Sequence, residues 1–268
     1  EDGTAITPLD VRSYFKDPDT GDTLTLSVDP ATLPLGITFN PATGTFSGTP
    51  DRNASQHGDD PLHPGVYHVT VTATDLLGET VTSIVTFTIV NPVPVANPDT
   101  NATTETGPVV TGNVITTGPG ADHDGHNDTD PLTVTGAVDS ASHPITLGSP
   151  TTLPGGGKLT LNSDGSYSFD PGTAYLWLKT GEHATEVVTY TIADGNGGTA
   201  TTTLTITIDG RDSAPVFGGL DTGAVTEDTT TTYSGTATVV DADAGQSSFV
   251  PSPVGGLAGT YGKLAIDA

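Results

Sequence analysis

Apolar and threonine residues alternate along several segments of the chain. The alternation is strict in residues 69–74 and 203–208, and a looser version occupies residues 84–89. Because successive side chains of a strand point to opposite faces, this pattern predicts half-buried β-strands with Val, Ile and Leu inward and Thr outward. No amphipathic helix is evident, and only a short turn is expected near residues 174–178.

Clusters of turn-forming residues separate these segments, at residues 19–22, 41–44, 162–165 and 194–198. Many short strands with turn signals at this spacing are typical of antiparallel sandwiches. The pattern therefore predicts an all-β protein built from tandem immunoglobulin-like or cadherin-like antiparallel β-sandwiches.

Three D-x-D elements divide the chain into repeats. They begin at Asp17, Asp128 and Asp241, so they lie 111 and 113 residues apart. A second repeated element, a strand that ends in Asp before a Gly-containing turn and another strand, occurs around Asp75 and Asp194. The repeat length suits one sandwich of roughly 100 residues.

The repeats predict three domains, at residues 1–92, 93–213 and 214–268. The third has early strands, expected at residues 232–240 and 261–266, but no closing Asp-turn-strand element. We expect it to be an incomplete sandwich, since half a repeat buries too little apolar area to be stable alone.

The composition excludes several classes of protein. The 268 residues carry 32 acidic and 7 basic side chains, for a net charge of -25, so nucleic-acid binding is excluded. Cys is absent, which excludes a disulfide scaffold, and no apolar run is long enough for insertion into a membrane. Only six of the acids are Glu, so most of the charge is Asp, which favours turns and loops.

Longer motifs resemble bacterial cell-surface repeats. FKDPDTGDTLTLSV, LPLGITFNPATGTFSGTP and YHVTVTATD, in the first predicted domain, resemble the bacterial cadherin-like (dystroglycan-type) domain. KLTLNSDGSYSFDP and TGEHATEVVTYTIADGNGGTATTTLTITI are similar to a VCBS or cadherin-like repeat. TGAVTEDTTTTYSGTATVVDADAG and GTYGKLAIDA resemble the first half of a VCBS repeat.

The resemblance implies a function as well as a fold. Such repeats are similar to the extender modules of large repeats-in-toxin adhesins, which Gram-negative bacteria export by type I secretion and hold at the cell surface. It implies an extracellular, non-catalytic, monomeric adhesion or biofilm segment, stiffened by calcium between neighbouring domains of one long chain. Its distal partner would be a surface glycan or protein.

Calcium takes six to eight oxygen ligands, which Asp-rich loops supply. In an immunoglobulin-type topology the D-x-D loop and the last hairpin turn share one end of the sandwich, facing the preceding linker. We therefore predict one site at the first junction, from Asn91, Asp99, Asp128, Asp130 and Asp194. A second is predicted from Asp209, Asp212, Asp241 and Asp243, and a third, at the free end of the first domain, from Asp17, Asp19, Asp22 and Asp75. The family's acid near each repeat start is matched by Glu1, Glu105 and Glu227.

Carboxylates brought this close repel one another, by about 1–4 kcal/mol per pair. Three or four pairs would cancel a domain's stability of roughly 5–15 kcal/mol, whereas a divalent ion reverses the sign. The alternative is that these Asp residues are ordinary solvated turn formers.

Two long loops depart from the family pattern, at residues 51–65 and 118–130. They suggest a second function, a ligand-binding module whose loops form a glycan or peptide pocket. His123 and His126 provide two zinc-type ligands, but a third and fourth are not evident, so a solvated acidic loop is favoured. An envelope-associated structural role without calcium is a third alternative.

No enzymatic motif is present: the chain lacks a Cys nucleophile, a G-x-S-x-G elbow and a P-loop. The aromatic residues Tyr167, Phe169, Trp177 and Tyr190 are assigned to core packing rather than to sugar stacking. We therefore predict a non-catalytic protein.

Overall fold

The computed structural model describes residues 1–18, 23–117, 120–125, 130–219, 224, 226, 228–229, 232–252, 256–259 and 262–265. Among these residues the regular elements are strands joined by turns, with short 3-10 helices at η1 (Arg12–Tyr14), η2 (Pro30–Thr32) and η3 (Ala54–Gln56). The predicted all-β class of tandem sandwiches is confirmed.

Two three-stranded sheets form the first sandwich. One has the order β1-β4-β3, from Leu9–Asp10, Thr45–Gly48 and Ile37–Asn40. The other has the order β2-β5-β6, from Thr25–Val28, Val66–Thr74 and Thr80–Thr88. Alternation sets the inner face of β5, where Val69, Val71 and Ala73 are at most 1% exposed. They pack with Phe46 and Leu26 into one hydrophobic core.

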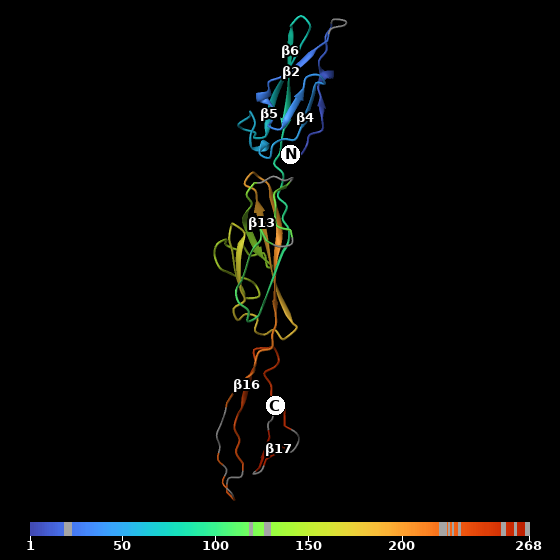
Figure 1. Ribbon diagram of the computed structural model, residues 1–268. Coiled ribbons are helices and arrows are strands. Elements are labelled where there is room, and N and C mark those ends of the chain that lie inside the picture. Colours follow the sequence, from blue (N-terminus) through green and yellow to red (C-terminus); the bar gives the residue numbers. More distant parts are fainter. Residues whose placement is uncertain are drawn as a thin grey trace.

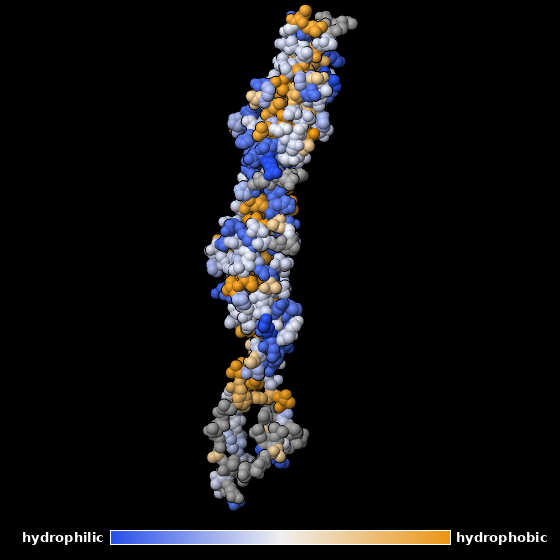
Figure 2. All heavy atoms as spheres, viewed as in Figure 1, coloured by the Kyte–Doolittle hydropathy of each residue, from blue (hydrophilic) through white to orange (hydrophobic). Residues whose placement is uncertain are grey.

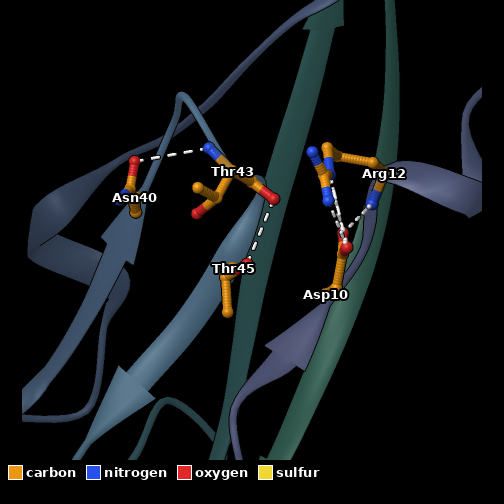
Figure 3. Close-up of polar contacts among 5 residues, drawn as sticks. All are labelled: Asp10, Arg12, Asn40, Thr43 and Thr45. Atoms are coloured by element: carbon orange, nitrogen blue, oxygen red, sulfur yellow. Dashed lines mark hydrogen bonds and ion pairs between the residues drawn. The ribbon is translucent and has the colours of Figure 1, made fainter.

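Figure 3 shows how the end of the β3–β4 hairpin is fixed. Asn40 Oδ1 accepts hydrogen bonds from the backbone N–H groups of Ala42 and Thr43, at 3.0 and 3.4 Å. Gly44 follows with φ of +58°, and a Cβ there would lie 2.3 Å from the Arg12 side chain. The turn therefore requires glycine. The Arg12 side chain, which packs beside Gly44, forms an ion pair with the exposed Asp10.

Two four-stranded sheets form the second sandwich. The sheet β10-β11-β12-β8 comprises Thr151–Thr152, Lys158–Leu161, Ser166–Asp170 and Val110–Asn113. The sheet β7-β14-β13-β9 comprises Asp99–Thr104, Thr199–Asp209, His183–Ala193 and Thr133–Asp139. β7 is parallel to β14, and the remaining pairs are antiparallel.

The core of the second sandwich contains most of the aromatic residues assigned to it. Phe169 and Tyr190 are fully buried and Tyr167 is 6% exposed. The assignment of Trp177 was wrong: its side chain is 49% exposed, because it lies in the turn region between β12 and β13. The Trp177 carbonyl instead accepts a hydrogen bond from the N–H of Ala244, in the carboxy-terminal part of the chain.

The carboxy-terminal part contains two short antiparallel ladders. β15 (Val216–Gly218) pairs with β16 (Thr238–Val240), and β17 (Leu257–Gly259) pairs with β18 (Gly262–Leu264). Both β16 and β18 are shorter than the strands expected there, and the side chains of this segment whose burial is described are mostly exposed.

The first sandwich, the second sandwich and the carboxy-terminal ladders follow one another along an elongated molecule, with the amino terminus beside the first boundary (Figure 1). Hydrophilic residues gather at the end of each sandwich that faces the next part of the chain (Figure 2). We call the boundary between the sandwiches, around residues 91–98, the first junction. The boundary around residues 209–215 is the second junction.

Candidate metal sites at the two junctions

Strand pairing brings the D-x-D segment and the last hairpin turn to the first junction. The turn that begins at Asp194 follows β13, and Ala193 pairs with Thr133 at the start of β9. Asp130, three residues before β9, therefore lies beside this turn. Its Oδ2 accepts hydrogen bonds from Asn196 Nδ2 and, at 2.9 Å, from Gln56 Nε2 of the first sandwich.

Asp194 is the buried centre of this turn, with an exposed fraction of 2%. Its Oδ1 accepts hydrogen bonds from the N–H groups of Asn196 and Gly198, at 2.7 and 3.0 Å. Its Oδ2 accepts a 2.8 Å hydrogen bond from Asn91 Nδ2. The linker amide is thus fixed to the second sandwich, while Asn91 Oδ1 is buried without a hydrogen-bond partner.

Asp2 is a candidate that residue type alone did not reveal. It is fully buried, its Oδ1 accepts a 2.9 Å hydrogen bond from the N–H of Ser55, and its Oδ2 has no partner. Its N–H donates to the Val90 carbonyl at 3.2 Å. The sequence predicts Glu1 instead, because Glu105 and Glu227 lie near the starts of the other repeats, and Glu1 is exposed.

Glu105 has the same backbone setting at the second junction. Its N–H donates to the Asp209 carbonyl at 3.0 Å, as Asp2 donates to Val90. The side chain is 1% exposed, and neither carboxylate oxygen accepts a hydrogen bond of normal geometry. Desolvation raises the pKa of Glu105, the backbone and charge of Arg211 lower it in part, and the charge of Asp243 raises it.

Asp243 faces Glu105 from the carboxy-terminal part of the chain. It is 1% exposed, and its Oδ2 accepts hydrogen bonds from Ser213 N–H and Gln246 Nε2, at 3.0 and 3.3 Å. Its Oδ1 has no partner. Asp241 stabilises the turn of this loop, because its Oδ1 accepts a 2.9 Å hydrogen bond from the Asp243 N–H.

The other two acids predicted for the second junction are more open. Asp209 is 2.8 Å from His183 Nδ1, and both side chains are about half exposed. Asp212 is exposed on the linker. Because water reaches both carboxylates, neither needs a cation to offset burial.

Asp99 does not lie with Asp130 and Asp194. It pairs with Leu204, within the second sandwich and away from the hairpin turn at the first junction. Its Oδ2 accepts a 2.7 Å hydrogen bond from the Tyr190 hydroxyl, which is also 3.2 Å from Asp122 Oδ2. Burial, with a further contribution from the Asp122 charge, raises the pKa of Asp99 to about 6, although the Tyr190 hydrogen bond opposes the shift. One hydroxyl proton cannot satisfy both carboxylates, so the pair favours an additional proton.

The remaining predicted residues lie at the free end of the first sandwich or outside the described part of the chain. Asp75 Oδ1 accepts the N–H groups of Leu77 and Glu79, at 2.9 and 2.8 Å, which shapes the β5–β6 turn. Thr25 pairs with Thr74, so Asp75 lies at the end of the sheet where the chain leaves Asp17 for β2. Outside the described residues lie Asp19, Asp22, Asp128, Glu227 and His126.

Within the described residues, no group of three or more His, Cys, Asp or Glu side chains converges closely enough to hold a metal ion. What the junctions do contain is buried oxygen without a donor. The atoms are Asp2 Oδ2, Asn91 Oδ1, both oxygens of Glu105 and Asp243 Oδ1. An all-oxygen set of carboxylates and an amide carbonyl fits calcium, which binds such ligands in flexible geometry.

The two sandwiches match different family models. Residues 91–210 match the model of the bacterial cadherin-like domain. They form a cadherin-like region. Residues 1–90 match the model of a putative Ig domain, and neither matched family is an enzymatic one.

Similar solved structures include cadherin repeats. Mouse cadherin-23 EC22-24 is 17% identical, over 70% of this chain and 52% of that one, with a TM-score of 0.29. The human desmocollin-1 ectodomain is 14% identical over 89% and 43%, with a TM-score of 0.32. An endo-fucoidan hydrolase of glycoside hydrolase family 107 is 22% identical over 76% and 31%, with a TM-score of 0.26.

TM-scores this low carry no functional argument, and this chain spans about half or less of the length of each of those structures. The search of curated proteins returned no match. Cadherin-like and Ig-like domains are extracellular adhesion modules, typically non-catalytic, and cadherin-like domains generally bind calcium. No helix in the described part of the chain is long and apolar enough to cross a membrane.

Proposed function

We propose that this chain is a calcium-stiffened extender segment of a bacterial cell-surface adhesin. In this proposal the domains are residues 1–92 and 93–213, followed by a VCBS-like repeat that begins at residue 214. The protein acts in adhesion or biofilm formation on the surface of a Gram-negative cell after type I secretion, as repeats-in-toxin adhesins do. Its immediate partners are the neighbouring domains of the same chain.

The observation that supports this proposal is Glu105. A buried carboxylate without a hydrogen bond costs several kcal/mol unless it is neutralised or paired. The charges of Arg211 and Asp243 both act on Glu105, and Asp243 itself has a buried oxygen without a partner. A calcium ion between these two side chains would turn a destabilising pair into a cross-link between the second sandwich and the carboxy-terminal part.

The proposed ligands follow from position. At the second junction they are Glu105, Asp209, Asp212, Asp241 and Asp243, together with Glu227. At the first they are Asp2, Asn91, Asp128, Asp130 and Asp194, with Glu1 and Asp99 as the outlying candidates. Asp17, Asp19, Asp22 and Asp75 form the set proposed at the free end of the first sandwich.

Small-angle X-ray scattering of the 268-residue chain in calcium and then in chelator tests the proposal. With calcium we expect a longer, stiffer particle and a higher Tm, because an ion bound only to the folded state stabilises it by about 4 kcal/mol at a thousand times its Kd. Magnesium at the same ionic strength is the control. Identical profiles and melting temperatures in calcium and chelator would contradict the proposal.

The ligand-binding alternative depended on the two long loops, at residues 51–65 and 118–130. Gln56 of the first loop donates to Asp130 of the second, so the loops contact each other across the first junction. His123 forms a β-bridge with Val95 of the linker. These contacts give both loops a structural role in holding the junction, and a glycan or peptide array that detects binding would be needed to add a second function.

A further inference from the structure

An apolar cleft opens on the side of the first sandwich, between β2 and β3, which are the edge strands of its two sheets. Its volume is about 450 Å³, and its described lining includes no charged side chain. The walls come from the end of β2, from the connection that contains η2, and from β3 and the residue after it. The apolar lining residues are Val28, Pro30, Leu33, Ile37, Phe39 and Pro41.

The cleft reaches down to the hydrophobic core of this sandwich. Ile37 belongs to the core and is 5% exposed, whereas Val28, Leu33 and Phe39 are only partly buried and pack against it. The ring centroid of Phe39 lies 4.7 Å from that of Phe46, the buried aromatic residue at the centre of the core. Apolar surface that stays open to water beside a core favours an apolar occupant.

The second sandwich fills the equivalent space with its own chain. Its strands β9 and β11 correspond to β2 and β3, because β9 pairs with β13 as β2 pairs with β5, and β11 pairs with β12 as β3 pairs with β4. Eighteen residues, 140–157, connect β9 to β11, against eight, 29–36, from β2 to β3. The longer connection includes β10 and places Ile145 and Leu153 in the core, at 5% and 2% exposed.

The longer connection also covers the outer edge of its strand. Thr151 of β10 pairs with Leu159 of β11, and the N–H of Gly148 donates to the Leu161 carbonyl at 2.8 Å. Among the described residues, no strand lies on the corresponding edge of β3. The difference comes from an internal connection that is described throughout, so the open cleft is a property of the first sandwich itself.

The open edge of β3 presents its backbone groups in a defined register. The Gly48 carbonyl of β4 accepts a 2.9 Å hydrogen bond from the Ile6 N–H, on the β1 side. Because the backbone groups of a strand alternate in direction, the preceding residue, Ser47, faces β3 and its partner Thr38. The N–H and carbonyl of Phe39, the next residue of β3, therefore point away from β4, along the side where the cleft opens.

We propose that this cleft binds a short extended segment of a partner protein, which adds to β3 as an antiparallel strand. A residue that exchanges both hydrogen bonds with Phe39 places its side chain on the same face as the Phe39 ring, over the cleft. The residue opposite Ile37, two positions away, shares that face. Both residues are therefore apolar, with a polar one between them. Main-chain hydrogen bonds supply the affinity and the cleft selects the side chains.

Charge favours a basic segment over an acidic one. Residues 1–92 carry twelve acidic and three basic side chains. Asp29 is exposed at the rim, between the lining residues Val28 and Pro30, and its Oδ1 accepts a 2.9 Å hydrogen bond from the Ala31 N–H. An acidic segment would be repelled, as would a second copy of this chain, whose net charge is -25. The inference goes beyond the proposed function and does not depend on calcium.

A synthetic peptide tests the proposal on the 268-residue chain. The probe is Lys-Val-Thr-Val-Thr-Lys with blocked termini, and the control, Lys-Val-Val-Thr-Thr-Lys, has the same composition without the alternation. Amide hydrogen exchange is followed residue by residue by NMR, in calcium and again in chelator. Under both conditions we expect the probe alone to slow exchange of the Phe39 amide by about tenfold or more. The Thr38 amide, which faces β4, is the internal reference and should not change.

Asp29→Asn keeps an acceptor for the Ala31 N–H but removes the charge, so it should weaken binding of the probe by about two- to fivefold. Glu79→Gln, at an exposed acid of the same sandwich, is the matched control and should leave binding unchanged. An unchanged Phe39 amide, or equal slowing by the probe and the control peptide, would overturn the proposal. A concentration-dependent dimer of the free chain that the probe dissociates would assign the cleft to a second copy instead.

Discussion

The two junctions use equivalent acids in different surroundings. Asp2 and Glu105 are both buried, and each donates its N–H to a carbonyl at or just beyond the last strand of its sandwich. At the first junction, protein donors reach the neighbouring carboxylates: Ser55 to Asp2, Asn91 to Asp194 and Gln56 to Asp130. At the second, neither oxygen of Glu105 accepts a hydrogen bond of normal geometry, although the Arg211 backbone lies close enough to lower its pKa in part.

This difference indicates that the first junction is partly held by the protein itself. The β-bridge between Val95 and His123 adds a backbone contact to the side-chain hydrogen bonds. The second junction has contacts of its own, from Ser213 and Gln246 to Asp243, but a greater excess of unpaired buried charge. We expect calcium removal to loosen the second junction more than the first.

The largest effect is expected from Glu105→Gln. In calcium, the loss of a charged ligand should weaken binding at the second junction by at least about tenfold, as measured by calorimetric titration. In chelator the same substitution should raise Tm, because a neutral amide costs less to bury than a carboxylate. Glu182→Gln, at an exposed glutamate of the same sandwich, is the control. A drop in Tm without calcium would contradict the difference between the junctions.

The carboxylate pair below the first junction predicts a pH dependence. Because the folded-state pKa of Asp99, at about 6, is higher than its ordinary value of 3.8, the folded protein holds a proton that the unfolded chain has released. The stability from Asp99 is thus full below about pH 4 and declines as the pH rises through 6.

The pKa difference of about two units corresponds to at most about 3 kcal/mol. Urea unfolding in chelator at pH 4.5 and 7.5 measures it. Asp99→Asn should flatten the slope, leaving the part due to Asp122, whose pKa is also raised by burial. A wild-type slope that persists undiminished in Asp99→Asn would assign the dependence elsewhere.

A smaller effect is expected from Asn91→Ala. The substitution removes the donor to Asp194 Oδ2 and leaves that buried oxygen unsatisfied, at a cost of about 1–3 kcal/mol in chelator. Denaturant titration gives the value. Asn53→Ala is the matched control, because the exposed Asn53 side chain makes no capping hydrogen bond. Equal unfolding free energies for the two variants would show that the first junction does not depend on this contact.

The smallest effect is expected from Arg12→Ala, far from either junction. Its 2.7 Å pair with Asp10 is exposed on both sides, so solvent screens the charges. The Tm should change less than in Asn91→Ala, as measured by calorimetry. A larger change would mean that surface pairs contribute to stability on the same scale as the junctions.

Much of the fold could be predicted because strand alternation is a local signal. The predicted strands at residues 69–74, 84–89 and 203–208 correspond to β5, β6 and β14, with β6 ending one residue earlier. Topology also explains why Asp130 lies beside Asp194, since both flank paired strands.

Other features depend on tertiary contacts that no local pattern encodes. Asp2, and not Glu1, is the equivalent of Glu105, because its N–H donates to the carbonyl of Val90 as that of Glu105 donates to Asp209. The residue type alone favours Glu1, since the equivalent residue is Glu. Asp99 lies deeper in the second sandwich than predicted, where its carboxylate accepts a hydrogen bond from the buried Tyr190 hydroxyl. Trp177 is 49% exposed because it lies in the turn region between β12 and β13 rather than on a strand.

Diffraction from crystals grown in calcium, with anomalous data, tests the central claim most directly. We predict a peak between Glu105 and Asp243, with carboxylate oxygens at about 2.3–2.6 Å from the ion. If that space holds no anomalous scatterer, the second junction is not a calcium site.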